Sequence, residues 1–192
     1  LIRVTARVVL FRRPWDYPTY GCGAVPNHGG DEMSFELKDS AGSDESGFRF
    51  WHSVPVRFRD VDVAGHAHHA DALIYFEEAR WAYWTQVVGQ TRVEDLNYVL
   101  AECRVRWHAR VLWPQTVSVG VRVSRVGRKH FEMQYEVRSE DGEKLQSGST
   151  VQVMYDYAVG GSTLMPNDLR QTLERFDGPF DEDLASQVQS GM

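Results

Sequence analysis

The sequence predicts an α+β fold in which a curved antiparallel sheet wraps one long, apolar helix. Three observations carry this expectation: a strand pattern from Ser53, an apolar helical segment at about 69–88, and a run of alternating apolar and polar residues after it. Sequential antiparallel strands with a single apolar helix bury that helix most simply against one face of their own sheet.

The first half of the domain contains a strand, a loop and a helix. Val54, Val56 and Phe58 alternate with polar neighbours, as in a strand, and a turn-rich loop follows at 60–68. The helix then shows apolar residues at three- and four-residue spacings over most of its surface. Gly89 is expected to end it.

The second half reads as four strands and a short helix. Asp141-Gly142 predicts a hairpin turn within it, and Pro166 opens the short terminal helix. The four strands are expected where apolar and polar residues alternate, around 99–107, 117–123, 131–137 and 150–157.

The chain divides into an extension, one domain and a tail. Residues 1–50 are rich in proline, glycine and small acidic residues, a composition that buries too little surface to offset its ordering entropy. We expect a flexible extension there, a domain at 51–178, and a C-terminal tail at 179–192. Because Met33 opens a more ordinary stretch, one hypothesis is that 1–32 is not native sequence.

Composition excludes several functional classes. The net charge of −6 argues against a general nucleic-acid binder. No apolar run approaches the roughly 20 residues of a membrane span. The two cysteines, Cys22 and Cys103, are too few for a secreted disulfide scaffold, so a cytoplasmic location is expected. Cys103 lies in a strand pattern and is expected to be a core residue.

The loop and helix start carry the chemistry. They read RFRDVDVAGHAHHADALIYFEEAR, with an Asp-x-Asp-x-x-Gly-His loop followed by Tyr-Phe-Glu-x-Ala-Arg. This stretch resembles the 4-hydroxybenzoyl-CoA thioesterase-like family of the hotdog superfamily, and the resemblance extends over roughly residues 53–178. It implies a hotdog fold of five or six strands around the central helix. The matching residues are Asp60, Asp62, Gly65, His66, Tyr75, Phe76, Glu77, Ala79 and Arg80.

The resemblance implies that Asp62 is the catalytic carboxylate of an acyl-CoA or acyl-carrier-protein thioesterase. A carboxylate at the start of a helix can act as nucleophile or general base, while free N–H groups there hold an oxyanion. In the family that N–H comes from the position of His69, and Gly65 shapes the loop. The alternative from spacing alone is that Asp62 only caps the turn or helix.

Other polar residues of this segment have competing interpretations. Asp60 is expected to hold the loop through backbone hydrogen bonds. Glu77 belongs to the motif and is the rival carboxylate, whereas Glu78 is expected to face solvent. His66, His68 and His69 could offer imidazoles to zinc, but no partner stands at metal-ligand spacing and the family is metal-free, so neither a metal nor another cofactor is expected.

The resemblance also implies partners. Arg128 and Lys129 match positions that touch the nucleotide of coenzyme A, although a solvated hairpin tip explains them equally well. A homodimer with a continuous sheet, or a dimer of dimers, is implied, with sites between subunits. A non-catalytic acyl-CoA-binding module is the alternative of another class; a hotdog dehydratase is a weaker one, because the Asp-x-Asp-x-x-Gly-His loop does not match it.

Overall fold

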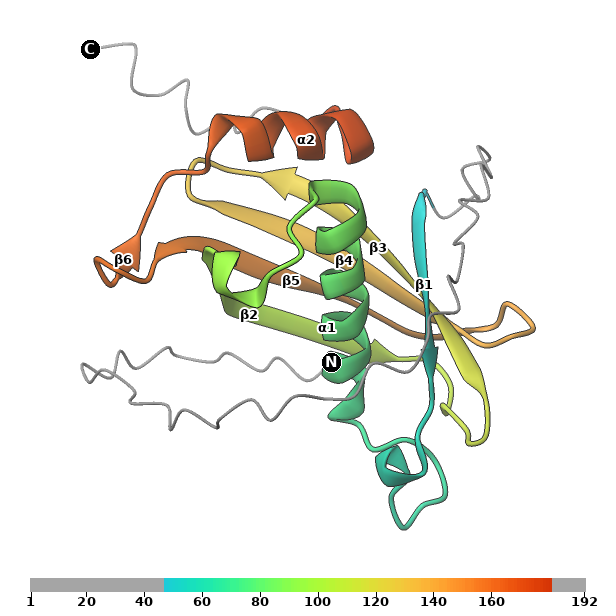
Figure 1. Cartoon of the computed structure of the whole chain (residues 1–192). Coiled ribbons are helices and arrows are strands. Elements are labelled where there is room, and N and C mark those ends of the chain that lie inside the picture. Colours follow the sequence, from blue (N-terminus) through green and yellow to red (C-terminus); the bar gives the residue numbers. More distant parts are fainter. Residues whose placement is uncertain (1–46, 181–192) are drawn as a thin grey trace, which may run out of the picture.

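The computed structural model describes residues 47–180 (Figure 1). Most of the expected extension at 1–50 and tail at 179–192, with Cys22 and Met33, lies outside the described residues, so the proposed boundaries stay predictions. No helix in the described part is long and apolar enough to cross a membrane.

The strands form one antiparallel sheet that curls around a helix, as expected (Figure 1). Its order is β1-β3-β4-β5-β2, and the short β6 adds to β5. The first strand begins before Ser53 and the fifth before Thr150, and the sequence pattern gave no sign of β6. The strands are β1 Phe50–Pro55, β2 Tyr98–Trp107, β3 Thr116–Val126, β4 His130–Arg138, β5 Lys144–Asp156 and β6 Gly161–Ser162.

The helix spans two connected parts, α1 at Asp71–Tyr83 and a π-helical turn, η2, at Trp84–Val88. It begins two residues later than expected, because the backbone oxygen of His68 accepts the N–H of Asp71 in a preceding turn (2.9 Å). It ends as expected at Gly89, whose φ of 82° is favourable for glycine.

The remaining helices are short. Two are 3-10 turns, η1 at Phe58–Asp60 and η3 at Val93–Asp95. The terminal helix, α2, at Asn167–Asp177 begins directly after Pro166, as expected. The expectation that Phe58 belongs to the first strand is wrong, since the Asp60 carboxylate accepts the Arg57 N–H and turns the chain into η1.

The core lies between α1 and the concave face of the sheet. Alternate residues of β3 are buried there, as the valine pattern predicted: Val117, Val119, Val121 and Val123. The ring of Phe76 stacks on Tyr135 with centroids 4.4 Å apart, and Trp84 stacks on Phe131 at 5.1 Å. Burying aromatic rings of this size supplies much of the stabilisation of a small domain.

The sheet has two edge strands, β1 and β2. Among the described residues, β1 pairs only with β3. Within residues 47–180, β2 pairs only with β5, so its other edge has no partner strand. Leu100 and Trp107 on this strand are exposed. A long unpaired edge with apolar side chains favours pairing with another strand.

Gly148 of β5 fixes how closely α1 approaches the sheet. A Cβ at this position would lie 2.5 Å from Cε2 of Phe76 and 2.4 Å from the backbone oxygen of Arg104. Both distances are too short for a real contact, and a backbone oxygen cannot swing away. The helix therefore packs on the sheet at a distance that only glycine permits here.

We expect Gly148→Ala to lower the free energy of unfolding by about 1–3 kcal/mol, the usual cost of overpacking a core. Chemical denaturation measures the change. Gly161→Ala is the matched control, because a Cβ there meets nothing within 4 Å. Equal stability of the two variants would show that α1 is not held this closely to the sheet.

Candidate active site

The Asp62 loop joins β1 to α1 and closes on itself. Val61 and Ala67 form an isolated antiparallel bridge. Inside it, the N–H of Asp62 donates to the His66 oxygen (3.0 Å) and the N–H of Gly65 donates to the Asp62 oxygen (3.0 Å). Gly65 has a φ of 77°, a conformation that favours glycine. The sequence therefore places Asp62 in a tight, defined turn.

The Asp62 carboxylate is half-buried and uses only one of its oxygens structurally. Oδ1 accepts the N–H of Ala64 (2.8 Å), which is the turn-capping role weighed from the sequence. Among the described residues, Oδ2 has no hydrogen-bond or ion-pair partner. Capping and chemistry are thus compatible: one oxygen orients the side chain and the other is available to a ligand.

Asp60 holds the two ends of this loop, as expected. Its carboxylate is 7% exposed, and Oδ2 accepts the N–H of Arg57 (2.9 Å) and the hydroxyl of Tyr75 on α1 (3.3 Å). Its backbone oxygen accepts the N–H of His68 (2.7 Å). Burial and the neighbouring Asp60 carboxylate raise the pKa of Tyr75, so the hydroxyl stays a donor at neutral pH.

The backbone N–H groups around the helix start differ in their partners. The N–H of Ala70 donates to Nδ1 of His68 (3.2 Å), and that of Asp71 donates to the His68 oxygen. Within residues 47–180 the N–H of His69, which the sequence singled out, has no acceptor. Burial raises the pKa of Asp71, with a further contribution from Asp60. Such an N–H before a helix can stabilise negative charge on a ligand oxygen.

The histidines of the loop have separate environments. Nδ1 of His66 lies 3.1 Å from the Ala67 oxygen. The rings of His68 and His69 are 3.9 Å apart, and the His69 ring meets the edge of Trp107 on β2 at 6.4 Å. In the part of the chain that the structure describes, no group of three or more His, Cys, Asp and Glu residues is placed to hold a metal ion.

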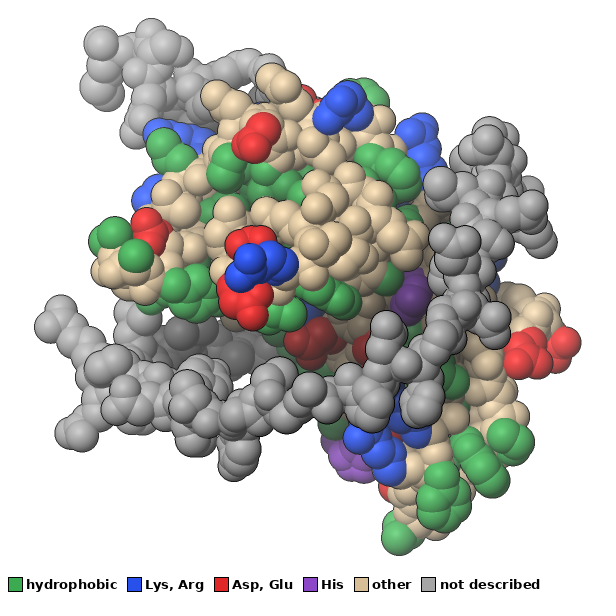
Figure 2. Space-filling view, viewed as in Figure 1, with side chains coloured by type: hydrophobic (Ala, Val, Ile, Leu, Met, Phe, Trp, Pro, Cys, Tyr) green, Lys and Arg blue, Asp and Glu red, His purple; other side chains and the backbone are tan. Residues whose placement is uncertain are grey.

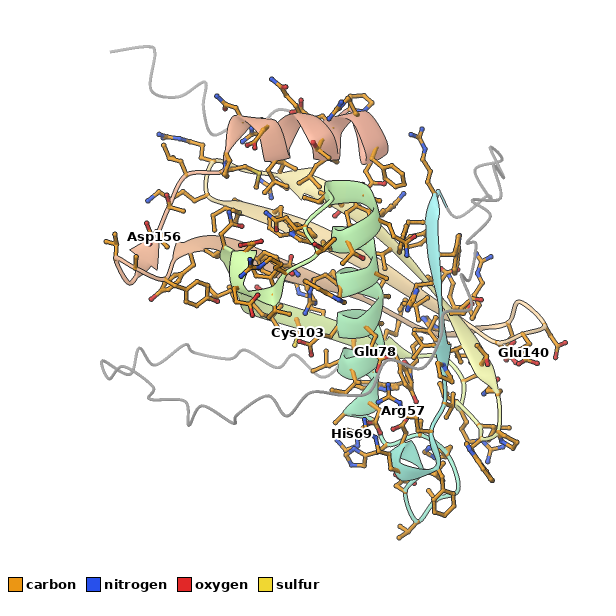
Figure 3. All side chains as sticks on the ribbon, viewed as in Figure 1. Arg57, His69, Glu78, Cys103, Glu140 and Asp156 are labelled. Carbon is orange, nitrogen blue, oxygen red and sulfur yellow. The ribbon has the colours of Figure 1, made fainter. Side chains whose placement is uncertain are left out.

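The two glutamates of α1, Glu77 and Glu78, have different surroundings. Glu77 is 67% exposed, with Oε1 4.0 Å from the buried guanidinium of Arg80. Glu78, expected to face solvent, instead bonds to Arg57, as Figure 3 shows. That expectation was wrong because Arg57 turns back over α1 where the chain enters η1. The Glu78–Arg57 pair is a second connection between the loop and the helix, and no spacing of residues predicted it.

Arg128 and Lys129 lie at the opposite end of the sheet, in the β3–β4 turn. Their backbone oxygens accept the N–H groups of Met165 and Met154, and Nζ of Lys129 lies 3.3 Å from Oγ of Ser162. The Asp62 loop lies at the end of the sheet where β3 begins. Thr116, the first residue of β3, follows Gln115, whose backbone oxygen accepts the N–H of Val56 just before the loop. An eleven-residue strand rises roughly 33 Å, so one protomer does not bring these cations to Asp62.

Sequence reasoning missed the aromatic neighbour of the helix start. Trp107 closes the strand pattern of 99–107 and had no role assigned from the sequence, but its ring contacts His69 and is 41% exposed. Its position at the end of the β2 pattern, far along the chain from the loop, gave no local signal. Cys103 is a free thiol and half-buried, in partial agreement with the expected core position.

Comparisons with known proteins place the chain in one family. Residues 56–173 match the model of the thioesterase-like superfamily. The uncharacterized protein YsmA of Bacillus subtilis (strain 168) is 25% identical over 129 residues, which cover 67% of this chain and 88% of that protein.

Solved structures confirm the hotdog arrangement. A thioesterase from Thermus thermophilus, complexed with coenzyme A and Zn, is 30% identical with a TM-score of 0.63, covering 69% of this chain and 97% of its own. A 1,4-dihydroxy-2-naphthoyl-CoA thioesterase from Synechocystis has a TM-score of 0.60 at 16% identity, covering 68% of this chain and 98% of its own. The second likeness concerns the fold alone.

We expect Tyr75→Phe to loosen the Asp62 loop, because the buried Asp60 carboxylate then loses one of its two donors. The free energy of unfolding should fall by about 1–2 kcal/mol, and amide exchange should rise across 60–68. Tyr157→Phe is the control, since that hydroxyl donates to the Tyr98 oxygen from an exposed side chain. Unchanged exchange in the loop would contradict the holding role of Tyr75.

Proposed function

Since the chain belongs to the thioesterase-like superfamily, we propose that it hydrolyses an acyl-coenzyme A, or an acyl-carrier-protein thioester, to a free acid and a thiol. Family membership supports thioester hydrolysis in general terms. The finer assignment, to the 4-hydroxybenzoyl-CoA thioesterase-like branch with Asp62 as its carboxylate, is our proposal.

The observation that carries the proposal is the pairing of two free groups on one short segment. Asp62 Oδ2 and the His69 N–H lie on either side of the Val61–Ala67 bridge, and neither has a partner among the described residues. A thioester carbonyl needs both a carboxylate, to attack it or to activate water, and a donor for its developing oxyanion. Gly65 and His66 shape the turn between them.

Two chemical routes use the same residues. As a nucleophile, Asp62 adds to the carbonyl carbon, the C–S bond breaks, and the thiolate leaves and takes up a proton; water then hydrolyses the mixed anhydride. As a general base, Asp62 removes a proton from a water molecule that attacks the carbonyl directly. In both routes the His69 N–H donates to the oxygen that becomes negative.

The placement of Arg128 and Lys129 supports a site made from two copies of the chain. The unpaired edge of β2 can pair with the same edge of a second copy about a two-fold axis. Because the two β2 strands then run antiparallel, the Trp107 end of one protomer meets the Tyr98 end of the other. This brings the Asp62 loop of one copy toward the β3–β4 turn end of its partner.

We therefore propose a homodimer, which can pair again into a dimer of dimers, with cations on the partner binding the phosphates of coenzyme A. Arginine and lysine bind phosphate through charge-assisted hydrogen bonds. Both side chains are exposed and so are open to such a ligand. No metal or redox cofactor takes part in this proposal.

Asp62→Asn should lower thiol release from acyl-CoA by about a hundredfold or more, the scale of a lost general base. A panel of aromatic, short and long acyl-CoAs, followed with a thiol reagent, measures the change and identifies the acyl class. Asp141→Asn, in the exposed β4–β5 turn, is the matched control. Unchanged turnover in Asp62→Asn would move the role to Glu77, and acyl-CoA binding without any turnover would favour the non-catalytic module.

A mixed dimer tests whether the cations act across the subunit interface. One chain carries Asp62→Asn, and the other carries Arg128→Ala with Lys129→Ala. The homodimer of the chain with Arg128→Ala and Lys129→Ala should show a KM for acyl-CoA raised about tenfold or more. Its KM for an N-acetylcysteamine thioester, which lacks the phosphates, should not change.

Co-expression of the two chains should then restore one complete site per mixed dimer, with the KM of the unmodified protein. If the cations served the Asp62 of their own chain, no complete site could form. The KM of the mixed dimer would then stay as high as that of the homodimer without the two cations.

A further inference from the structure

Four large apolar side chains stand exposed at the end of the molecule that carries the Asp62 loop. Phe58 is 75% exposed, Leu112 and Trp113 are each 48% exposed, and Val63 is fully exposed. The rings of Phe58 and Trp113 meet edge to face at 5.5 Å, so the two loops they belong to share one surface. We call these four residues the loop-tip patch.

The loop-tip patch rests on a fixed scaffold. The loop after β1 and the segment before β3 are joined by two backbone bonds, from Ala67 N–H to the Val111 oxygen (2.8 Å) and from Val56 N–H to the Gln115 oxygen (2.9 Å). Figure 1 shows the loop after β1 projecting beyond the sheet, and Figure 2 shows hydrophobic side chains gathered at this end. The patch is therefore a set of protruding tips and not a flat sheet face.

The proposed dimer does not account for these residues. That pairing uses the edge of β2, whereas the loop-tip patch lies where β1 ends and β3 begins, at the other edge of the sheet. Contiguous exposed apolar surface on a protein of this size usually marks an interaction. The core cluster includes none of the four residues.

Two exposed arginines flank the loop-tip patch, although the whole chain carries −6. Arg59, next to Phe58, is 73% exposed and has its Nε 3.7 Å from Oδ1 of the buried Asp60. The exposed Arg110 lies two residues before Leu112. The carboxylates of the same loops are withdrawn, since Asp60 is buried and Asp62 half-buried. Glu140, an exposed acid in the β4–β5 turn, is tied to the start of β3, because its Oε1 accepts the N–H of Thr116 (3.1 Å).

We infer that the loop-tip patch docks the protein on an anionic lipid surface. Aromatic and branched apolar side chains at loop tips insert into the boundary between headgroups and acyl chains, and nearby arginines pair with anionic headgroups. Arg59 can keep its guanidinium among the headgroups while Phe58 and Val63 enter below it. Docking through this patch holds the Asp62 loop at the lipid surface, where long acyl chains partition.

Vesicle co-sedimentation of the full chain tests the inference without any turnover. The protein should sediment with vesicles of phosphatidylcholine and phosphatidylglycerol, and much less with phosphatidylcholine alone. Val63→Ser combined with Leu112→Ser should weaken partitioning by at least about tenfold, because two apolar side chains lose their burial. Arg59→Gln should weaken it about fivefold, and only with the anionic vesicles.

Val159→Ser is the matched control, because Val159 is also highly exposed but lies in the turn between β5 and β6. It should sediment like the unmodified chain, and Val63→Ser alone should show an intermediate loss. Absence of sedimentation by the unmodified chain, or equal sedimentation by the patch variants, would overturn the inference. So would a change in oligomeric mass without a change in vesicle binding, which would assign the patch to a contact between copies.

Discussion

The buried carboxylate of Asp60 is the interaction on which the candidate site depends. It joins the end of β1, through the Arg57 N–H, to α1, through the Tyr75 hydroxyl, and its backbone oxygen holds His68 at the far end of the loop. A buried carboxylate with two donors is stable only if both remain in place. The positions of Asp62 and His69 follow from this one anchored residue, and the Glu78–Arg57 pair supports it from the next turn of α1.

The second constraint is the length of the strands. Because β3 separates the Asp62 loop from the β3–β4 turn, the two sets of residues that suggest thioester chemistry and phosphate binding lie at opposite ends of one protomer. The open edge of β2 offers a simple way to unite them, since antiparallel pairing of two β2 strands reverses one copy against the other. The open edge of β2 and the separation of the two groups thus support the same assembly.

Much of the fold was predictable, because strand alternation and the apolar helix are local signals. The valines of β3, the stop at Gly89 and the helix after Pro166 all lie as the sequence indicated. The contacts that build the site were less predictable. Tyr75 was known only as part of a motif, and Trp107 and Arg57 reach the loop and helix through tertiary contacts that no spacing reveals. Glu78 was misjudged for the same reason.

A crystal structure with an acyl-CoA analogue, in which a methylene replaces the thioester sulfur, would show directly which groups hold the carbonyl and the phosphates. We expect the ketone oxygen to lie within hydrogen-bond distance of the His69 N–H of one protomer, with Oδ2 of Asp62 facing the carbonyl carbon. We also expect Arg128 and Lys129 of the partner subunit to hold the phosphates. A ketone bound away from the Asp62 loop, or phosphates held by the same protomer that supplies Asp62, would contradict this expectation.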